Sequence, residues 1–394
     1  MSFKTNRRDW IVSVAASGLA ACIQKPNGEN EYSATPQPES FGGQPAIRLT
    51  RNAKPAGDAP LLLHADILPG RGFNTWQLQA YIPGKGVTDL FTAPPLPEAA
   101  NLLNGGPSDY RGNESFKNGG AILIPFANRI RGKVDEQART VETTVNGTKV
   151  WLPANWSGKE PGAERHAIHG LLLDQPVQIT RQDGGAESAV LEGVWEKPFG
   201  KEWPGKAKVV FHTSLSATAF VLKVTVTNTG TEALPLGIGW HPYFQIPSGD
   251  RRQAKLKIPA NTRAMVDNYD NVFPTGAVES TAGSAFDFRE PRAMNGQFLD
   301  DCFFDLIRDA DGSVTAEIQD PASHFAIRVR SQSPLIQTYQ CYAPTEKPFI
   351  VLEPQFNAGD PFNKEVWKDR KTGMILLAPG KQADYDATVE IAKV

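Results

Sequence analysis

Three short segments of this chain carry side chains that can move protons near neutral pH. They contain His169, His241 and Glu353, which are two imidazoles and one carboxylate. Each histidine lies next to a glycine or a proline at the edge of an apolar run, where strand ends and loops present side chains to a cleft. This placement favours acid–base chemistry over packing for the three residues.

His241 and Glu353 are the best candidates for an acid and a base. His241 ends the apolar run 236–240, and the proline that follows it interrupts strand pairing, so its imidazole is expected at a strand end or a bulge. Glu353 follows the apolar run 349–352. A carboxylate in such surroundings is partly desolvated, which raises its pKa and its basicity. A base of this kind suits the removal of a proton from a sugar hydroxyl.

Charged side chains among apolar neighbours are candidates for binding a substrate. Arg129 follows Asn128 at an expected strand end, and its fork of donors fits vicinal hydroxyls or an active-site carboxylate. A structural ion pair is the alternative role. Asp300 and Asp301 lie among aromatic residues, a position that suits the binding of hydroxyls, and one of the two is expected to be only solvated.

The rest of the sequence predicts an all-β frame for these residues. The 394 residues are 40% hydrophobic and 21% charged with a net charge of -2, which indicates neither disorder nor a surface for nucleic acid. The 35 Gly and 31 Pro favour many short elements joined by turns. Apolar and polar residues alternate over 220–227, 314–318 and 325–330, whereas no long stretch holds a helical period. We therefore expect a large antiparallel β sandwich with few short helices.

The first 22 residues resemble a bacterial export signal. Arg7 and Arg8 precede Trp10 and a weakly apolar stretch that is too short to span a bilayer, as in a twin-arginine signal. The stretch ends at Cys22 in a sequence similar to the lipobox of lipoproteins, in which the signal is cut before the cysteine and its thiol is acylated. An ordinary secretory signal and a cytoplasmic tail are the alternatives. We expect an exported, periplasmic lipoprotein that is anchored to a bacterial membrane only through Cys22.

The chain after this signal is expected to form one domain behind a linker. Residues 23–45 are rich in Pro, Gly, Glu and Ser and show no periodicity, which is typical of a flexible tether. No second linker of this kind follows, so residues 46–394 are expected to fold as one unit. The sequence leaves open whether Cys302 and Cys341 form a disulfide. No spacing of Cys and His suggests a metal site.

Taken together, the motifs resemble the aldose 1-epimerase or galactose mutarotase family. Members share five short segments in a fixed order, and this chain has the same order over roughly residues 45 to 390. The matching segments are Asn128-Arg129-Ile130, His169-Gly170, His241-Pro242-Tyr243-Phe244, Asp300-Asp301-Cys302-Phe303 and Glu353-Pro354-Gln355. The family's fold is a large β sandwich, in agreement with the strand pattern.

The resemblance implies a role for each candidate proton carrier. Glu353 matches the glutamate that takes the proton from the anomeric hydroxyl, and His241 matches the histidine that protonates the ring oxygen. His169 is similar to the second family histidine, which holds the ring-oxygen side or nearby hydroxyls. His166, three residues earlier, competes for this role because the segment before it is similar to an inserted loop.

The resemblance also implies the substrate and the binding residues. Arg129 and Asp300 match the sugar-binding arginine and aspartate, with Asp301 as the alternative acid, and Asn128 beside Arg129 is expected to bind the substrate as well. The implied reaction interconverts the α and β anomers of an aldohexose and needs no metal or organic cofactor. A non-catalytic carbohydrate-binding lipoprotein is the alternative function, followed by an enzyme that cleaves glycans, in which two carboxylates would flank the bond.

Overall fold

The structure is a computed structural model that describes residues 31–54 and 57–394. The expected export signal, the acylated Cys22 and residues 23–30 of the expected tether lie outside the described residues. Among the helices in the described part of the chain, none is long and apolar enough to cross a membrane.

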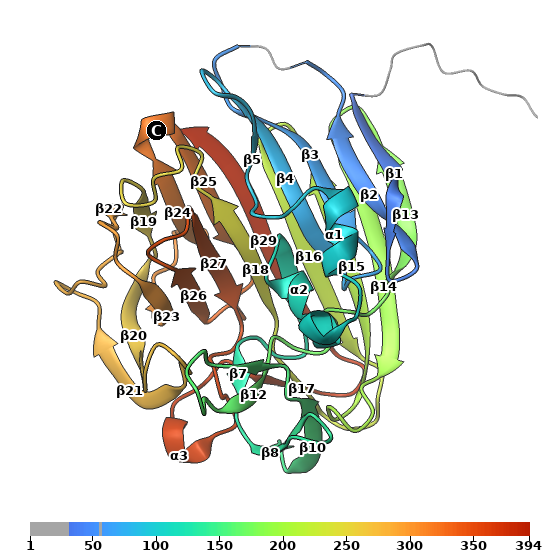
Figure 1. Cartoon of the computed structure of the whole chain (residues 1–394), viewed down its shortest axis with the longest axis vertical. Helices are drawn as coiled ribbons and strands as arrows, with labels where there is room; N and C mark the ends of the chain where they lie inside the picture. Colours follow the sequence, from blue (N-terminus) through green and yellow to red (C-terminus); the bar gives the residue numbers. More distant parts are fainter. Residues whose placement is uncertain (1–30, 55–56) are drawn as a thin grey trace, which may run out of the picture.

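Two large antiparallel sheets dominate the described residues (Figure 1). We name the twelve-stranded one the first sheet. Its strands, in spatial order, are β1 (Tyr32–Phe41), β2 (Gln44–Arg51), β3 (Leu61–Leu68), β4 (Asn74–Ile82), β6 (Gly120–Leu123), β18 (Gly239–Gln245), β27 (Phe349–Gln355), β26 (Thr338–Ala343), β23 (Leu299–Leu306), β20 (Ala260–Val266) and β21 (Pro274–Ser280), with β5 (Gly86–Asp89) paired to β4.

The second sheet has nine strands within the described residues and packs against the first. In spatial order they are β13 (Gln178–Gly184), β14 (Ala189–Pro198), β15 (Lys206–Leu215), β16 (Ala219–Asn228), β29 (Gln382–Lys393), β25 (Phe325–Ser331), β24 (Val314–Asp320), β19 (Lys255–Lys257) and β22 (Arg292–Ala293).

Short elements complete the domain, and many of them gather at one end of the sandwich (Figure 1). The small sheets are β10 (Thr148–Pro153), β9 (Thr140–Val145) and β8 (Lys133–Asp135); β11 (Trp156–Ser157), β12 (Arg165–Ile168) and β7 (Arg129–Ile130); and β17 (Leu234–Leu236) with β28 (Ile375–Leu377). The helical segments are α1 (Leu96–Leu102), η1 (Pro107–Gly112), α2 (Asn113–Phe116), η2 (Pro321–Ser323) and α3 (Lys364–Trp367).

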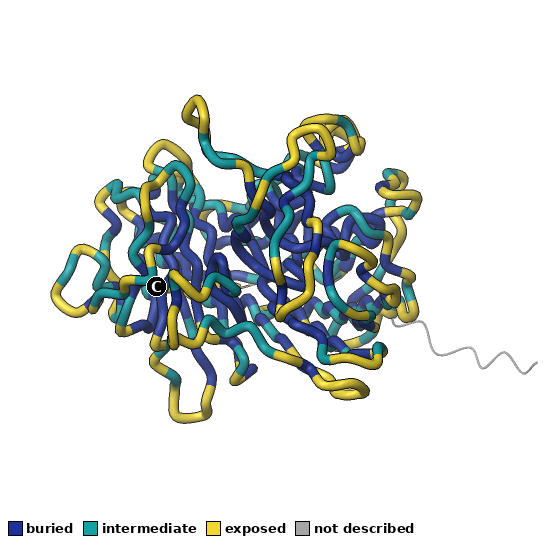
Figure 2. The backbone as a smooth tube through the Cα atoms, turned by 90° about the horizontal axis from the view of Figure 1, so that it is seen from below, coloured by how far each residue is buried: buried dark blue, intermediate teal, exposed yellow. Residues whose placement is uncertain are grey.

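Alternation of apolar and polar residues builds the core between the two sheets. In β16, Phe220, Leu222, Val224 and Val226 are fully buried, whereas the residues between them are partly or fully exposed. This is the period of two by which a strand directs alternate side chains to opposite faces. Burial is concentrated in the central strands, and exposed backbone lies in the peripheral loops (Figure 2). The prediction of a large antiparallel β sandwich with few short helices is confirmed.

The prediction of a tether as far as residue 45 is wrong. Strands β1 and β2 form a hairpin, and its two-residue turn consists of Gly42 at φ 56° and Gly43 at φ 79°. Positive φ at both positions is the geometry of a tight hairpin turn, which glycine adopts without strain. Tyr32 and Phe41 are buried at the two ends of β1. The prolines that suggested a linker lie in an edge strand, where a missing N–H removes few ladder hydrogen bonds.

The two cysteines left open by the sequence are both free and buried. They lie on neighbouring strands, where Cys302 pairs with Gln340 and Cys341 pairs with Asp301. Paired residues direct their side chains to the same face, and adjacent residues to opposite faces. Cys302 and Cys341 therefore project from opposite faces of the first sheet, which prevents a disulfide.

Candidate active site

Strand register brings the candidate proton carriers to one face of the first sheet. His241 in β18 is two residues before Tyr243, which pairs with Val351 in β27, and Glu353 is two residues after Val351. Glu353 in turn pairs with Gln340 in β26. These side chains lie on the face turned away from the core, because the alternate residues of the same strands belong to the core cluster. We call this face the outer face.

His241 and Glu353 are in direct contact on the outer face. His241 Nε2 lies 3.3 Å from Glu353 Oε1, and the exposed fractions of the two residues are 5% and 1%. The other carboxylate oxygen of Glu353 accepts a hydrogen bond of 2.7 Å from the amide of Gln355. The carboxyl group is thus held in one orientation, with Oε1 turned to the imidazole.

The environment of this pair favours a single shared proton. Burial, with a smaller effect of Asp300, raises the pKa of Glu353 well above its usual value of 4.5. Burial and the positive charge of Arg129 lower the pKa of His241 to about 3. Both shifts disfavour the charged forms, so over a wide pH range the pair carries one proton between Oε1 and Nε2. A pair with one proton can donate at one atom while it accepts at the other.

His169 lies beside His241 because the loop after β12 turns sharply. The backbone of His169 has a positive φ of 61°, and its N–H donates to the carbonyl oxygen of Asn128. The two imidazole centroids are 4.7 Å apart, and Phe116 contacts both rings edge-on. Burial, with a smaller effect of the positive charge of Arg129, lowers the pKa of His169 well below its usual value, so its ring is neutral.

Arg129 and Asp300 form the polar side of the site. Arg129 Nη2 lies 3.2 Å from Asp300 Oδ2, and Arg129 Nη1 donates to the side-chain oxygen of Asn128. Gln340 connects the group, because its amide donates to Asp300 over 2.6 Å and its oxygen accepts from Asn128. Arg129 Nε and His169 Nδ1 are buried without a hydrogen-bond partner among the described residues. The site therefore has spare hydrogen-bonding capacity, as expected where a polar ligand binds.

The structure places the two competing candidates, Asp301 and His166, away from this group. Asp301 follows Asp300 and projects from the opposite face of β23, where it is paired with Arg263 and accepts from the hydroxyl of Tyr269. His166 is fully buried with its ring edge-on to Phe273 and its Nδ1 hydrogen-bonded to a backbone carbonyl. Both residues thus have structural contacts, whereas Asp300 and His169 lie in the site.

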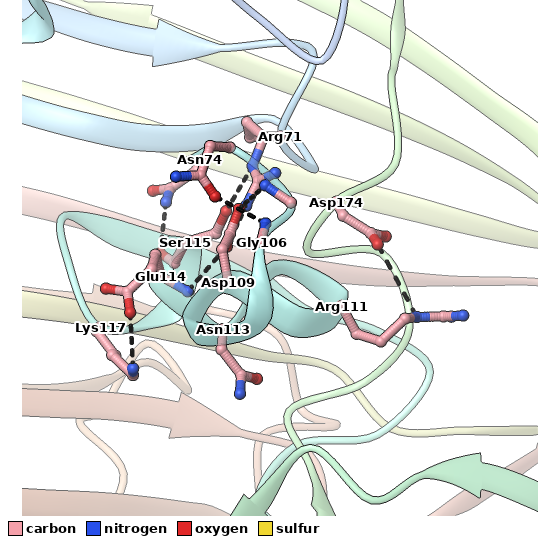
Figure 3. Close-up of polar contacts among 12 residues, drawn as sticks. Arg71, Asn74, Gly106, Asp109, Arg111, Asn113, Glu114, Ser115, Lys117 and Asp174 are labelled. Carbon is pink, nitrogen blue, oxygen red and sulfur yellow. Dashed lines mark hydrogen bonds and ion pairs between the residues drawn. The ribbon is translucent and has the colours of Figure 1, made fainter. Parts of the chain in front are cut away.

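A buried polar network supports the segment that carries Phe116 (Figure 3). Arg71 makes a bidentate ion pair with Asp109 at 2.6 and 2.8 Å and donates to the hydroxyl of Ser115. Asn74 donates to the carbonyl oxygen of Ser115. The network therefore fixes the short helical segments η1 and α2 on the outer face, directly before the ring that packs on the two histidines.

A second clamp connects α2 to the backbone next to His169. Asn113 donates to the carbonyl oxygen of Asn155, and the Asn155 amide donates back to the Asn113 side chain. Asn155 also exchanges two hydrogen bonds with the backbone of Ile168. Three segments that are distant in the sequence thus hold the second imidazole in place.

Sequence reasoning did not identify Gln340, Phe116 or the Arg71–Asp109 pair. Gln340 alternates with the buried Tyr339 and Cys341, and a polar residue at a regular position of an apolar strand was a usable signal. Phe116 and the ion pair gave no such signal, because their relation to the histidines exists only in the folded chain. Among the described residues, no group of three or more His, Cys, Asp or Glu is arranged to hold a metal ion.

Comparison with known proteins identifies the family. The family model for aldose 1-epimerase matches residues 91–389. The chain is 25% identical to the uncharacterised protein YphB of Escherichia coli over 283 residues, which are 68% of this chain and 82% of that protein. It is 24% identical to the galactose mutarotase of Rattus norvegicus over 234 residues, or 55% and 62% of the two chains.

A solved structure shows the same fold. The crystal structure of a galactose mutarotase-like protein from Clostridium acetobutylicum superposes with a TM-score of 0.68 and 17% identity, and the match covers 92% of this chain and 99% of that one. Because the family model spans about three quarters of the sequence, the chain belongs to the aldose 1-epimerase family.

Proposed function

We propose that this protein is an aldose 1-epimerase that interconverts the α and β anomers of aldohexoses. The observation that carries this proposal is the buried contact of 3.3 Å between His241 Nε2 and Glu353 Oε1. The adjacent group of Arg129, Asp300 and Gln340 offers donors and acceptors for sugar hydroxyls. Family membership and the similarity to a galactose mutarotase support the same class of reaction.

The proposed mechanism uses the shared proton of the pair. Transfer of the shared proton from Glu353 Oε1 to His241 Nε2 gives the carboxylate and imidazolium that react. Glu353 then removes the proton from the anomeric hydroxyl while His241 protonates the ring oxygen, so that the bond between C1 and the ring oxygen breaks and a free aldehyde forms. The aldehyde turns about the bond between C1 and C2. Ring closure on either face then reverses both proton transfers, with His241 as base and Glu353 as acid. The neutral ring of His169 is suited to hydrogen bonds with the ring-oxygen side.

Polarimetry tests the proposal directly. Purified protein should accelerate the relaxation of freshly dissolved α-D-glucose or α-D-galactose toward the equilibrium rotation. A protein that binds these sugars tightly in calorimetry but leaves the relaxation rate unchanged would instead be a carbohydrate-binding protein. Release of new reducing ends from an oligosaccharide would favour the glycan-cleaving alternative.

We also propose, from the sequence of residues 1–22 alone, that the protein is exported and lipid-anchored through Cys22. Expression of the full chain in a bacterium supplied with labelled palmitate tests this. The wild-type protein should carry label and fractionate with membranes, whereas Cys22→Ser should do neither. Label-free wild-type protein in the soluble fraction would contradict the anchor without affecting the proposed reaction.

A further inference from the structure

A line of aromatic rings leads away from the catalytic pair along the outer face. The ring of Tyr243 lies 5.0 Å from that of His241, centroid to centroid. Further contacts then connect Tyr243 to Phe349 at 5.0 Å, Phe349 to Tyr342 at 6.1 Å, Tyr342 to Phe298 at 6.3 Å and Phe298 to Tyr269 at 5.1 Å. We call these five residues, Tyr243, Phe349, Tyr342, Phe298 and Tyr269, the aromatic strip.

Strand register places the strip on the same face as the active site. Phe349 is four residues before Glu353 in β27, and Tyr342 is two residues after Gln340 in β26. Tyr342 pairs with Asp300 in β23, and Phe298 lies two residues before Asp300. Even spacing along a strand keeps side chains on one face. Four rings of the strip therefore share the outer face with the proton-carrying pair, and Tyr269, in the loop between β20 and β21, contacts Phe298 at the edge of this face.

Exposure rises along the strip from the site outward. Tyr243 is 8% exposed, Phe349, Tyr342 and Phe298 are half-buried, and Tyr269 is 43% exposed. Exposed groups of large apolar rings are a feature of ligand-binding surfaces. The gradient runs from the buried catalytic centre to solvent, which is the geometry of a path for a long substrate.

The exposed end of the strip is held rigidly. The Tyr269 hydroxyl donates to Asp301 at 3.0 Å and accepts from Arg263 at 3.1 Å, and both of these charged residues are buried. This ion pair therefore fixes a surface ring from behind. A preorganised ring binds a ligand with a smaller loss of side-chain entropy than a mobile one.

The strip has the chemistry of a carbohydrate surface. Aromatic faces pack against the apolar C–H faces of pyranose rings, and phenol hydroxyls exchange hydrogen bonds with sugar hydroxyls. Among the described residues, the hydroxyls of Tyr243 and Tyr342 make no hydrogen bond with the protein, so both are available to a ligand. The strip itself contains no charged side chain, which favours a neutral glycan.

We propose that the substrate is a neutral reducing oligosaccharide whose second and third units lie along the aromatic strip. This inference rests on the proposed function, because the reducing-end ring would occupy the site at His241 and Glu353. A single pyranose ring held at His241 and Glu353 cannot also lie on the strip, because Phe349, Tyr342 and Phe298 follow one another outward at centroid distances of 6.1 and 6.3 Å. The strip would therefore contribute to oligosaccharides an affinity that monosaccharides lack.

Anomer exchange at equilibrium tests the inference, because saturation-transfer NMR of the anomeric protons measures it for any reducing sugar. The probes are D-glucose and D-galactose, and disaccharides and trisaccharides of glucose and galactose with α and β linkages. We expect kcat/KM for at least one trisaccharide to exceed that of its reducing-end monosaccharide by about tenfold. A panel on which no oligosaccharide exceeds its monosaccharide would overturn the inference.

Variants then locate the effect. Phe298→Ala and Tyr342→Ala should each lower the ratio of trisaccharide to monosaccharide kcat/KM by about three- to tenfold, as expected for loss of one stacking ring. Trp151→Ala removes an exposed ring from β10, outside the strip, and should leave the ratio unchanged. An unchanged ratio in both strip variants would overturn the inference.

The failure of the inference and that of the proposed function are distinguishable. Rapid exchange of glucose or galactose without a preference for oligosaccharides contradicts only the role of the strip. Absence of exchange for every sugar contradicts the epimerase itself. Thermal unfolding of each variant shows whether it is folded, and the wild-type panel remains decisive if a strip variant does not fold.

Discussion

Two buried arginine–aspartate pairs on the outer face differ in how completely they are satisfied. Arg71 and Asp109 form a bidentate pair, and Asp109 also accepts from the backbone N–H groups of residues 105 and 114. Arg129 and Asp300 share one contact of 3.2 Å, and Arg129 Nε has no partner among the described residues. The first pair has the geometry of a structural support, whereas the second retains donors for a ligand.

The difference predicts that the first pair contributes mainly to stability and the second mainly to ligand binding. Breaking a buried, fully bonded pair leaves a desolvated charge and lowers stability. Changing a pair with free donors removes contacts that form only when a ligand is present, and this lowers activity. Substitutions in each region test the division, beginning with the catalytic carboxyl group itself.

Glu353→Gln should reduce the rate of anomer exchange by about 10²- to 10⁴-fold, because it removes a proton-transfer partner. The fold should be retained, since the amide keeps the shape of the side chain. Polarimetry and thermal unfolding measure the two quantities. Glu317→Gln, a change in the second sheet, is the matched control and should retain the rate. A Glu353→Gln enzyme with wild-type rate would show that this carboxyl group is not the base.

Arg71→Met should lower the free energy of unfolding by about 3–5 kcal/mol, because Asp109 would remain buried without its partner. Denaturant unfolding measures the loss. Activity should fall only if η1 and α2 become less ordered, because these segments position Phe116 against the two histidines. Arg181→Met breaks an exposed ion pair and should cost much less. Equal losses of unfolding free energy in the two variants would show that the buried Arg71–Asp109 pair stabilises the fold no more than an exposed ion pair does.

Asp300→Asn and Asp301→Asn sharpen the comparison because the two residues are adjacent. Asp300→Asn should lower kcat/KM by about 10- to 100-fold through a weaker contact with Arg129 and with sugar hydroxyls. Asp301→Asn should instead lower stability by about 1–3 kcal/mol, because it weakens the bonds to Arg263 and Tyr269. Steady-state kinetics should therefore show the larger loss for Asp300→Asn, and denaturant unfolding should show the larger loss for Asp301→Asn. If Asp301→Asn proved the more damaging to catalysis, the two aspartates would have been assigned to the wrong faces.

The sequence was sufficient for the parts of the molecule that depend on local pattern. Alternation over 220–227 predicted β16, and the residue types around His241 and Glu353 indicated proton chemistry. The expected strand end or bulge at His241 is wrong, because β18 continues through Pro242, which pairs with Gly120. Adjacent aspartates could not be separated from sequence, because their difference depends on which face of β23 meets the core. The same limit applies to His166 and His169, where a positive φ turns the second ring into the site.

Other features needed the folded chain for a different reason. Composition predicts a linker where the structure has the hairpin of β1 and β2, because edge strands tolerate proline and composition does not reveal an edge. Arg71 and Asp109 are 38 residues apart, and no local pattern connects them. The best predicted part of the site is thus its set of proton carriers, and the least predicted part is the support that positions them.

The pH dependence should show the smallest effect within the neutral range. The pair is active when it carries one shared proton. It loses this proton as the pH rises through the raised pKa of Glu353, and it gains a second one as the pH falls toward about 3, the lowered pKa of His241. Activity corrected for uncatalysed relaxation should therefore form a plateau that begins above about pH 3 and ends where the pH reaches the raised pKa of Glu353. A steep loss of activity as the pH falls through 6.5, the usual pKa of histidine, would mean that burial does not lower the pKa of His241.

Stability should follow the same titration with a defined sign. The folded-state pKa of Glu353 lies above its unfolded value near 4.5, so its contribution to stability is complete below that value and is lost as the pH rises toward the folded-state pKa. The amide side chain of the Glu353→Gln variant cannot titrate, so the stability of this variant relative to wild type should increase over this range. Denaturant unfolding at pH 4 and pH 8 measures the difference. Because Arg71→Met leaves Glu353 in place, it should not alter this pH dependence, which again separates the support from the site.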